Sequence, residues 1–98
     1  MDKAEALRRL RAREDDLRQM GVAGLSMFGS VARGDETAGS DVDLAVMLSG
    51  LEHLTAFDFV AIQQKAEAIL ETKVDLVSEP ARKVRLQAEI DRDRVHVF

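Results

Sequence analysis

Residues 22–48, VAGLSMFGSVARGDETAGSDVDLAVML, contain two apolar segments that are separated by a polar loop. The first segment, 22–28, is short and mostly small or apolar, and Gly29 and Ser30 follow it directly. This pattern predicts a buried strand that runs into a tight turn, with a short helix starting near Ser30. Residues 34–40 are polar and contain two glycines, which predicts a surface loop before the second apolar segment.

The second apolar segment, 41–48, alternates in polarity along most of its length. A β-strand points successive side chains to opposite faces, so the alternation predicts a strand with one buried face. The residues expected on the buried face are Val42, Leu44, Val46 and Leu48. The other face carries Asp41 and Asp43, whose carboxylates are therefore expected to point to the same side.

Helices are expected on both sides of this central region. Residues 2–20 are rich in Ala, Leu, Arg and Glu, and their apolar spacing predicts one helix that stops at Gly21. Thr55 and Asp58 fit the capping-box pattern, which predicts a second helix that runs to about Glu71. The apolar stripe of this second helix, expected to face the core, consists of Phe59, Ile62, Ala66, Ile69 and Leu70.

The C-terminal third of the chain predicts two further strands and a helix. Residues 73–77 alternate, with apolar side chains on one face and Asp75 on the other. Pro80 favours the start of a new helix over residues 81–91, and residues 95–98 predict a terminal strand. The order of elements predicts an α/β (α+β) fold in which helices flank a mixed central sheet.

Size and composition predict one domain that spans residues 1–98. A chain of 98 residues supports a single hydrophobic core, and 46% hydrophobic with 33% charged residues is typical of a folded globular protein. The absence of cysteine excludes disulfides, thiolate metal sites and a cysteine nucleophile. The N-terminal segment is charged, and no run of about 18 apolar residues occurs, so a cytoplasmic protein without a membrane partner is expected.

Charge argues against nucleic acid as a direct partner. Lys and Arg number 14 and Asp and Glu number 18, which gives a net charge of −4. Binding by phosphate neutralisation alone needs the opposite balance. The arginines near the N-terminus alternate with acidic residues, which predicts a solvated helix face with salt bridges. His53 and His96 have no partners at metal-ligand spacing and are assigned structural roles.

The carboxylates predict a metal site. The Cα atoms of Asp41 and Asp43 would lie about 6.7 Å apart on one face of a strand. Two acidic side chains so placed repel each other unless a cation lies between them. Asp75 repeats the arrangement on another strand, and it adds a third oxygen ligand if the two strands pair. Three carboxylates suit a hard divalent cation such as Mg²⁺.

The turn after the first strand predicts a phosphate site beside that metal. Gly29 allows the backbone to approach a phosphate closely, and Ser30 adds a hydroxyl group. Arg33, one helical turn later, is a further candidate phosphate contact. Two metal ions about 3.5–4 Å apart can stabilise the attacking and leaving oxygens of a displacement at phosphorus. The combination predicts phosphoryl or nucleotidyl transfer.

These motifs also resemble a known family. Gly29-Ser30, ten further residues and Asp41-Val42-Asp43 match the nucleotidyltransferase pattern of Gly-Ser, ten arbitrary residues and Asp-x-Asp, and Asp75 supplies the third acid. The chain is similar over nearly its whole length to the minimal nucleotidyltransferases of the polymerase-beta superfamily. Many of these are antitoxins paired with a HEPN-domain toxin, and their activity is metal-dependent transfer of AMP from ATP to a hydroxyl group of the toxin.

The resemblance implies a role for each matched residue. Gly29 and Ser30 would hold the triphosphate of ATP, Asp41 and Asp43 would bind both metal ions, and Asp75 would bind the catalytic ion. The resemblance implies a HEPN-type toxin as the partner in a hetero-oligomer. A small domain also leaves little surface to enclose a second substrate, so a partner is expected to complete the site. An alternative from another class is a non-catalytic antitoxin that neutralises its partner by occlusion.

Overall fold

A mixed four-stranded sheet forms the centre of the computed structural model, which describes residues 1–50 and 54–98. Its strands are β1 (Val22–Phe28), β2 (Val42–Leu48), β3 (Val74–Ser78) and β4 (Val95–His96). They lie in the order β3-β2-β1-β4. β1 is antiparallel to both β2 and β4, whereas β2 and β3 are parallel. The predicted α+β class and mixed sheet are therefore confirmed.

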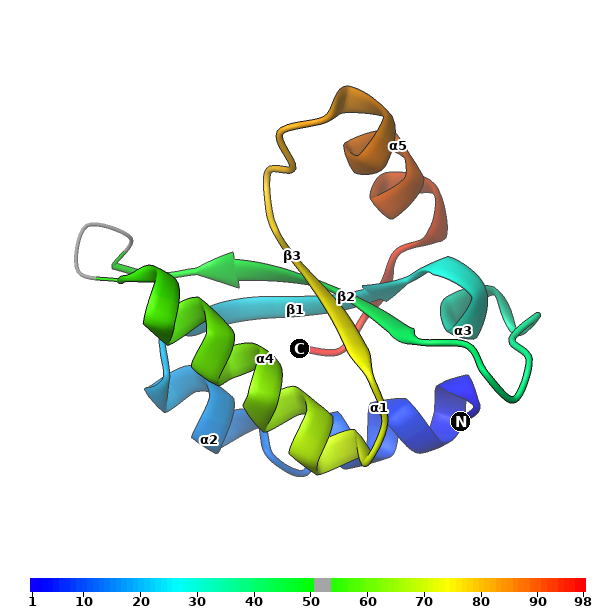
Figure 1. Cartoon of the computed structure of the whole chain (residues 1–98), viewed down its shortest axis with the longest axis horizontal. Helices are drawn as coiled ribbons and strands as arrows, with labels where there is room; N and C mark the ends of the chain where they lie inside the picture. The colour runs from blue at the N-terminus through cyan, green and yellow to red at the C-terminus, as the bar shows by residue number, and fades with distance from the viewer. Residues whose placement is uncertain (51–53) are drawn as a thin grey trace.

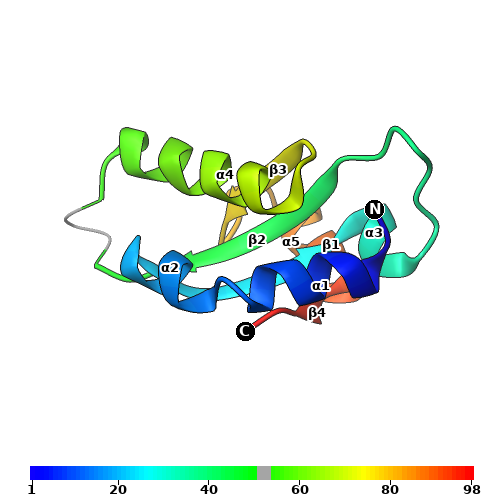
Figure 2. The same ribbon diagram turned by 90° about the horizontal axis from the view of Figure 1, so that it is seen from below.

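Helices cover both faces of the sheet. One face is covered by α1 (Lys3–Arg11), α2 (Glu14–Gln19) and α4 (Ala56–Leu70), which Figure 2 shows side by side. The other face carries α5 (Val84–Asp93), and α3 (Gly29–Arg33) follows directly from the end of β1 (Figure 1). None of the helices in the described residues is long and apolar enough to cross a membrane.

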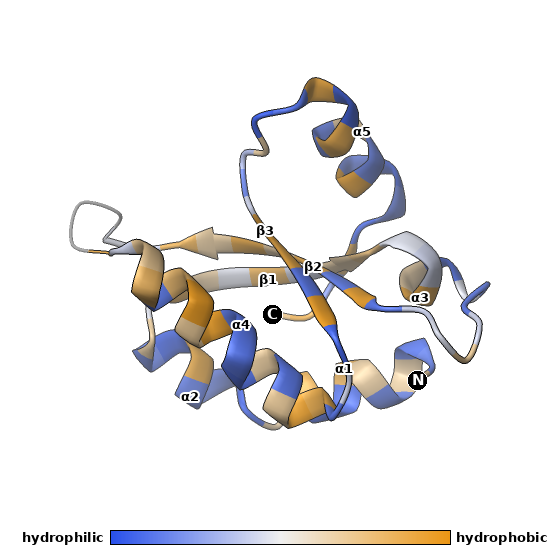
Figure 3. Cartoon of the chain, in the orientation of Figure 1, coloured by the Kyte–Doolittle hydropathy of each residue, from blue (hydrophilic) through white to orange (hydrophobic). Residues whose placement is uncertain are grey.

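The main core lies between the sheet and α1, α2 and α4. The alternation in β2 places Val42, Leu44 and Val46 on this side, each 0% exposed. They pack in one cluster with residues of the helices that include Ala6, Leu10, Leu17, Ile62, Ala66 and Leu70. A smaller cluster on the opposite face joins Phe28, Ala45 and Ile90. Figure 3 shows hydrophobic residues along β1 and β2 and in patches along α4.

The predicted single helix over residues 2–20 is wrong, because the chain breaks after Arg11 into α1 and α2. The last turn of α1 is basic, and α2 begins with Glu14, Asp15 and Asp16. Cations stabilise a helix C-terminus and anions an N-terminus, so this charge pattern favours two helices. Arg11 also donates hydrogen bonds to the carbonyl oxygens of Val97 (2.9 Å) and His96 (3.0 Å). The apolar spacing alone does not reveal the break.

Several other predicted boundaries shift in the structure. The helix predicted over 81–91 is α5 and begins only at Val84, because the Ala81 N–H donates to Gln87 Oε1 (2.8 Å) in a turn before the helix. The terminal strand is shorter than 95–98, although Val97 and Phe98 continue backbone hydrogen bonds with Leu25. The capping box of Thr55 and Asp58 is present, which confirms the start of α4.

Candidate active site

Asp43 and Asp75 are direct partners in the parallel pairing of β2 and β3. Residues paired in register point their side chains to the same face, and neighbouring strands lie about 4.8 Å apart. Asp41 lies just before β2, two residues from Asp43. Asp75 and Asp41 are exposed, whereas Asp43 is half-buried. The strand pairing thus brings two of the three predicted carboxylates together on the face that α5 covers, with Asp41 at its end.

Gly29 lies directly against Asp43. Its φ of +75° belongs to the left-handed region that favours glycine. A Cβ on Gly29 would collide with Asp43 Oδ2 and lie 3.0 Å from Cγ of the same carboxyl group. Phe28, the residue before it, is paired with Asp43 across the sheet. The glycine of the Gly-Ser turn is therefore required by the position of the carboxylate.

The electrostatic environment of Asp43 is negative. Burial is the main cause that raises its pKa to about 6, and the charges of Asp75, Glu89 and Asp41 raise it further. Arg33 acts in the opposite direction but has a smaller effect. A bound cation would favour the ionised form of the same group. Asp43, at the centre of the predicted site, is thus a carboxylate whose ionised form a bound cation would stabilise.

The three carboxylates have the donor chemistry of a site for a hard divalent cation, since all their ligand atoms are oxygens. The missing side chain of Gly29 leaves room for the Asp43 carboxylate against the turn, so one of these oxygen ligands lies next to the Gly-Ser motif. Within residues 1–50 and 54–98, however, no three Asp, Glu or His side chains converge closely enough to hold a metal ion. The roles of Asp41, Asp43 and Asp75 as metal ligands therefore stay predictions.

Arg33 connects α3 to α5. Its Nη1 lies 2.7 Å from Asp93 Oδ2, and its Nε lies 3.1 Å from Asp35 Oδ2. The Asp93 side chain is 3% exposed and also accepts a hydrogen bond from Arg92 Nε (3.0 Å). Hydrogen bonds from Arg92 and then Arg33 lower the pKa of Asp93 to about 2. The predicted phosphate contact of Arg33 stays a prediction, and its guanidinium already has two carboxylate partners.

A second arginine that sequence reasoning missed lies at the same end of α5, where Arg94 is the C-cap residue. Arg94 donates from Nη1 to Ser26 Oγ and to Glu79 Oε1, both at 2.9 Å, and from Nη2 to Glu79 Oε2 at 2.5 Å. Ser26, in the middle of β1, is 3% exposed. A polar residue inside an otherwise apolar strand was the one sequence signal of this network. Together, Arg33 and Arg94 fix α5 over the carboxylate face.

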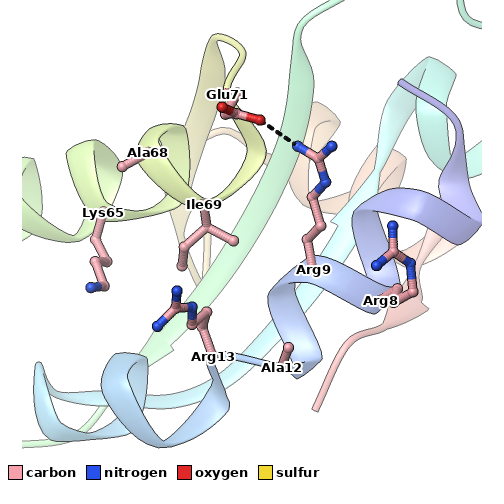
Figure 4. A pocket seen from close by; sticks show the side chains of 8 residues that line it. All are labelled: Arg8, Arg9, Ala12, Arg13, Lys65, Ala68, Ile69 and Glu71. Atoms are coloured by element: carbon pink, nitrogen blue, oxygen red, sulfur yellow. Dashed lines mark hydrogen bonds and ion pairs between the residues drawn. The ribbon is translucent and has the colours of Figure 1, made fainter.

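A basic cavity lies on the opposite side of the sheet. It has a volume of about 410 Å³ between α1 and α4, and Figure 4 shows its lining by Arg8, Arg9, Arg13 and Lys65. Arg9 pairs with Glu71 (3.2 Å), Arg8 and Arg9 pair with Glu5, and Arg13 and Lys65 pair with Asp16. The prediction of a salt-bridged helix face is confirmed, and this cavity is separate from the carboxylates.

The histidines take no part in the candidate site. His96 is exposed on β4, where it pairs across the sheet with Ser26. His53 lies outside the described residues.

Comparison with known proteins identifies the family. The nucleotidyltransferase domain matches residues 7–96. Protein adenylyltransferase MntA of Thermococcus cleftensis is 33% identical over 89 residues, which cover 90% of this chain and 88% of the relative. A solved chain assigned as a minimal nucleotidyltransferase is 33% identical, with a TM-score of 0.72 over 97% of this chain and 95% of that one.

The same fold occurs in a toxin–antitoxin complex. A chain from the structure of the tri-AMPylated Shewanella oneidensis HEPN toxin with MNT antitoxin has a TM-score of 0.66 at 19% identity. The similarity covers 94% of this chain and 71% of that chain. The family match extends over most of the chain and includes the Gly-Ser turn and all three carboxylates. This chain belongs to the nucleotidyltransferase domain family.

Proposed function

We propose that this protein transfers AMP from ATP to a hydroxyl group of a partner protein, with Mg²⁺ as the metal. The observation that carries the proposal is the register pairing of Asp43 with Asp75 beside Gly29. In this arrangement two carboxylates lie next to a turn whose first residue, Gly29, has no side chain. The name of the Thermococcus cleftensis relative, a protein adenylyltransferase, supports AMP as the transferred group and a protein as the acceptor.

We assign the two substrates to different sides of the site, and the strand order supports this assignment. Gly29 and Ser30 follow β1, whereas Asp75 lies on the edge strand β3 with Asp43 between them. We assign the triphosphate of ATP to the Gly29–Ser30 turn and the acceptor hydroxyl to the exposed side of Asp75. The glycine lets backbone N–H groups approach the phosphates, and Ser30 contributes its hydroxyl.

The reaction is an in-line displacement at the α-phosphorus. The acceptor oxygen forms a bond to this phosphorus, the bond to the β-phosphate oxygen breaks, and pyrophosphate leaves. Asp75 orients the hydroxyl and accepts its proton. Asp41, Asp43 and Asp75 would hold the divalent metal, which supplies charge neutralisation for the phosphates and lowers the pKa of the acceptor hydroxyl. α5 shields this face of the sheet through Ile90, which packs against Phe28 and Ala45.

The proposed partner is a HEPN-type toxin. The fold recurs in the complex of tri-AMPylated Shewanella oneidensis HEPN toxin with MNT antitoxin, and this supports both a HEPN partner and a hetero-oligomer. In that reading the protein is an antitoxin that neutralises its partner by covalent modification.

Intact mass spectrometry tests the proposal. The protein is incubated with a HEPN-domain protein that forms a stable complex with it, together with ATP and Mg²⁺. We expect the partner to gain about 329 Da for each AMP group, the mass added in a phosphoester. Asp43→Asn should keep the complex but add no mass. Asp15→Asn, an equal change at an exposed residue of α2, should act like wild type.

The same experiment separates catalysis from occlusion. An occluding antitoxin would neutralise its partner without nucleotide, and Asp43→Asn would be as effective as wild type. An unmodified partner that is fully neutralised would therefore replace the proposal with the binding-module alternative.

A further inference from the structure

A second cavity opens next to the candidate site, at the end of β3. It has a volume of about 550 Å³ and lies between this strand and the segment that leads into α5. Its apolar wall includes Val77, Ala81 and Leu86, and its rim carries Arg82 and Lys83. We refer to these five residues as the β3-edge pocket. An apolar wall with charged residues at its rim is typical of a binding site.

The β3-edge pocket lies on the same face of the sheet as the carboxylates. Val77 is two residues after Asp75, so the two Cα atoms are about 6.7 Å apart and both side chains point to that face. Val77 and Leu86 pack against the small core cluster that contains Phe28. The pocket is therefore a direct continuation of the site past Asp75.

The cations at this pocket differ from most others in the chain. In α1, α2, α3 and the end of α5, arginines such as Arg9, Arg18, Arg33 and Arg94 lie within 4.0 Å of a carboxylate. Arg82 and Lys83 are exposed, and within the described residues neither makes such an ion pair. Their positive charges are thus available to an acidic ligand, although the chain as a whole has a net charge of −4.

We propose that the β3-edge pocket binds a segment of the acceptor protein in which an apolar side chain is flanked by Asp or Glu near the modified hydroxyl. The inference rests on the proposed function, because Asp75 is the carboxylate assigned to the acceptor. The apolar side chain fills the space beside Val77, Ala81 and Leu86. The acidic neighbours pair with Arg82 and Lys83. The hydroxyl group then lies at Asp75, two residues before Val77 on the same strand.

Strand order favours the acceptor over the nucleotide as the occupant. The triphosphate is assigned to the Gly29–Ser30 turn at the end of β1, and β2 separates that turn from β3. The pocket begins beyond Asp75, on the opposite side of Asp43 from Gly29. An acceptor that approaches the edge strand meets the pocket and Asp75 together.

Fluorescence anisotropy with a labelled synthetic peptide tests the inference. The peptide contains a threonine, which supplies the hydroxyl group, and a leucine flanked by glutamates. Matched peptides replace the glutamates with glutamine or the leucine with serine. Wild type should bind the first peptide most tightly, with an affinity that falls as salt rises. The double variant Arg82→Glu/Lys83→Glu should lose about tenfold in affinity for it, because both rim charges are reversed.

Two further variants control this measurement. Lys3→Glu/Arg8→Glu makes the same change in net charge on exposed residues of α1, on the other face of the sheet, and should leave peptide affinity unchanged. Ala81→Phe fills the pocket and should lower the affinity for the peptide, while the Kd for ATP stays within about twofold of wild type. Circular dichroism confirms that each variant is folded.

Three results would overturn the inference. The first is a failure of wild type to prefer the acidic leucine peptide, and the second is equal affinity in Arg82→Glu/Lys83→Glu. The third is loss of ATP binding in Ala81→Phe with peptide binding intact, which would make the pocket a nucleotide-base site. Normal, rim-dependent peptide binding without any AMP transfer would instead contradict the proposed function and leave the docking site standing.

Discussion

The carboxylate of Asp43 occupies the space in which a side chain on Gly29 would lie. Two motifs ten residues apart in the sequence are thus in contact, because β1 and β2 pair antiparallel and bring Phe28 opposite Asp43. Position 29 requires glycine for two separate reasons, because its φ is positive and because a Cβ would collide with Asp43. A matched pair of substitutions distinguishes them.

Gly29→Ala should abolish binding of ATP with Mg²⁺, because the new Cβ displaces the Asp43 carboxylate. Gly34→Ala is the control. Gly34 has a φ of +80°, close to the +75° of Gly29, but a Cβ there meets nothing within 4 Å. Both variants should lose about 1 kcal/mol of stability from the backbone strain. Isothermal titration calorimetry should show ATP binding in Gly34→Ala only, and equal affinities in the two variants would contradict the contact.

Asp43→Asn should stabilise the metal-free protein at neutral and basic pH. Burial and the neighbouring carboxylates raise the pKa of Asp43 to about 6, above the unfolded value of about 3.9. Ionisation therefore disfavours the folded state, and this penalty is absent below about pH 4 and complete above about pH 6. In EDTA, the variant should melt above wild type at pH 8 and close to it at pH 4.

Metal and nucleotide should reverse this order. Mg²⁺ with ATP should raise the Tm of wild type and have no effect on Asp43→Asn, since ligand binding to the folded state adds stability. A wild-type melting curve that does not respond to Mg²⁺ and ATP would contradict the assignment of the site. Asp15→Asn again serves as the control for the loss of one carboxylate.

The ion pairs of Asp93 with Arg92 and Arg33 should stabilise the fold at neutral pH and lose this effect in strong acid. Its partners lower the pKa of Asp93 to about 2, below the unfolded value. The contribution is complete above about pH 4 and is lost as pH falls toward 2. In urea unfolding, Asp93→Asn should be less stable than wild type at pH 7, and the difference should shrink between pH 4 and pH 2. A difference independent of pH would show that the charge on Asp93 adds nothing.

The sequence predicted the elements whose signals are local. The alternation in residues 41–48 predicted β2 and its buried face, and Thr55 with Asp58 predicted the start of α4. Asp43 and Asp75 lie together only because β2 and β3 pair in parallel. The sequence could not show that these two strands are neighbours. The long-range partners of Arg33 and Arg94 could not be predicted, because Asp93 and Ser26 lie 60 and 68 residues away from them. The break between α1 and α2 was readable from charge but not from apolar spacing.

Arg94→Met should cost about 3 kcal/mol of folding stability, because it leaves a buried carboxylate without its cation. The Glu79 side chain is 8% exposed, and the hydrogen bond from Arg94 is the main cause that lowers its pKa. Removal of the guanidinium also takes the hydrogen-bond partner from Ser26 Oγ. Arg85→Met, an equal change at an exposed residue of α5, should stay within about 0.5 kcal/mol of wild type.

The double variant Arg94→Met/Glu79→Gln identifies the cause of this loss. A neutral amide costs less to bury than an unpaired carboxylate, so the double variant should recover part of the stability lost in Arg94→Met. The recovery should also disappear at low pH, where protonation removes the charge of Glu79 in the single variant. Chemical denaturation at pH 7 and pH 3 measures both effects. Equal stability of the single and double variants at pH 7 would mean that Arg94 acts by packing, and that the ion pair with Glu79 does not hold α5 over the site.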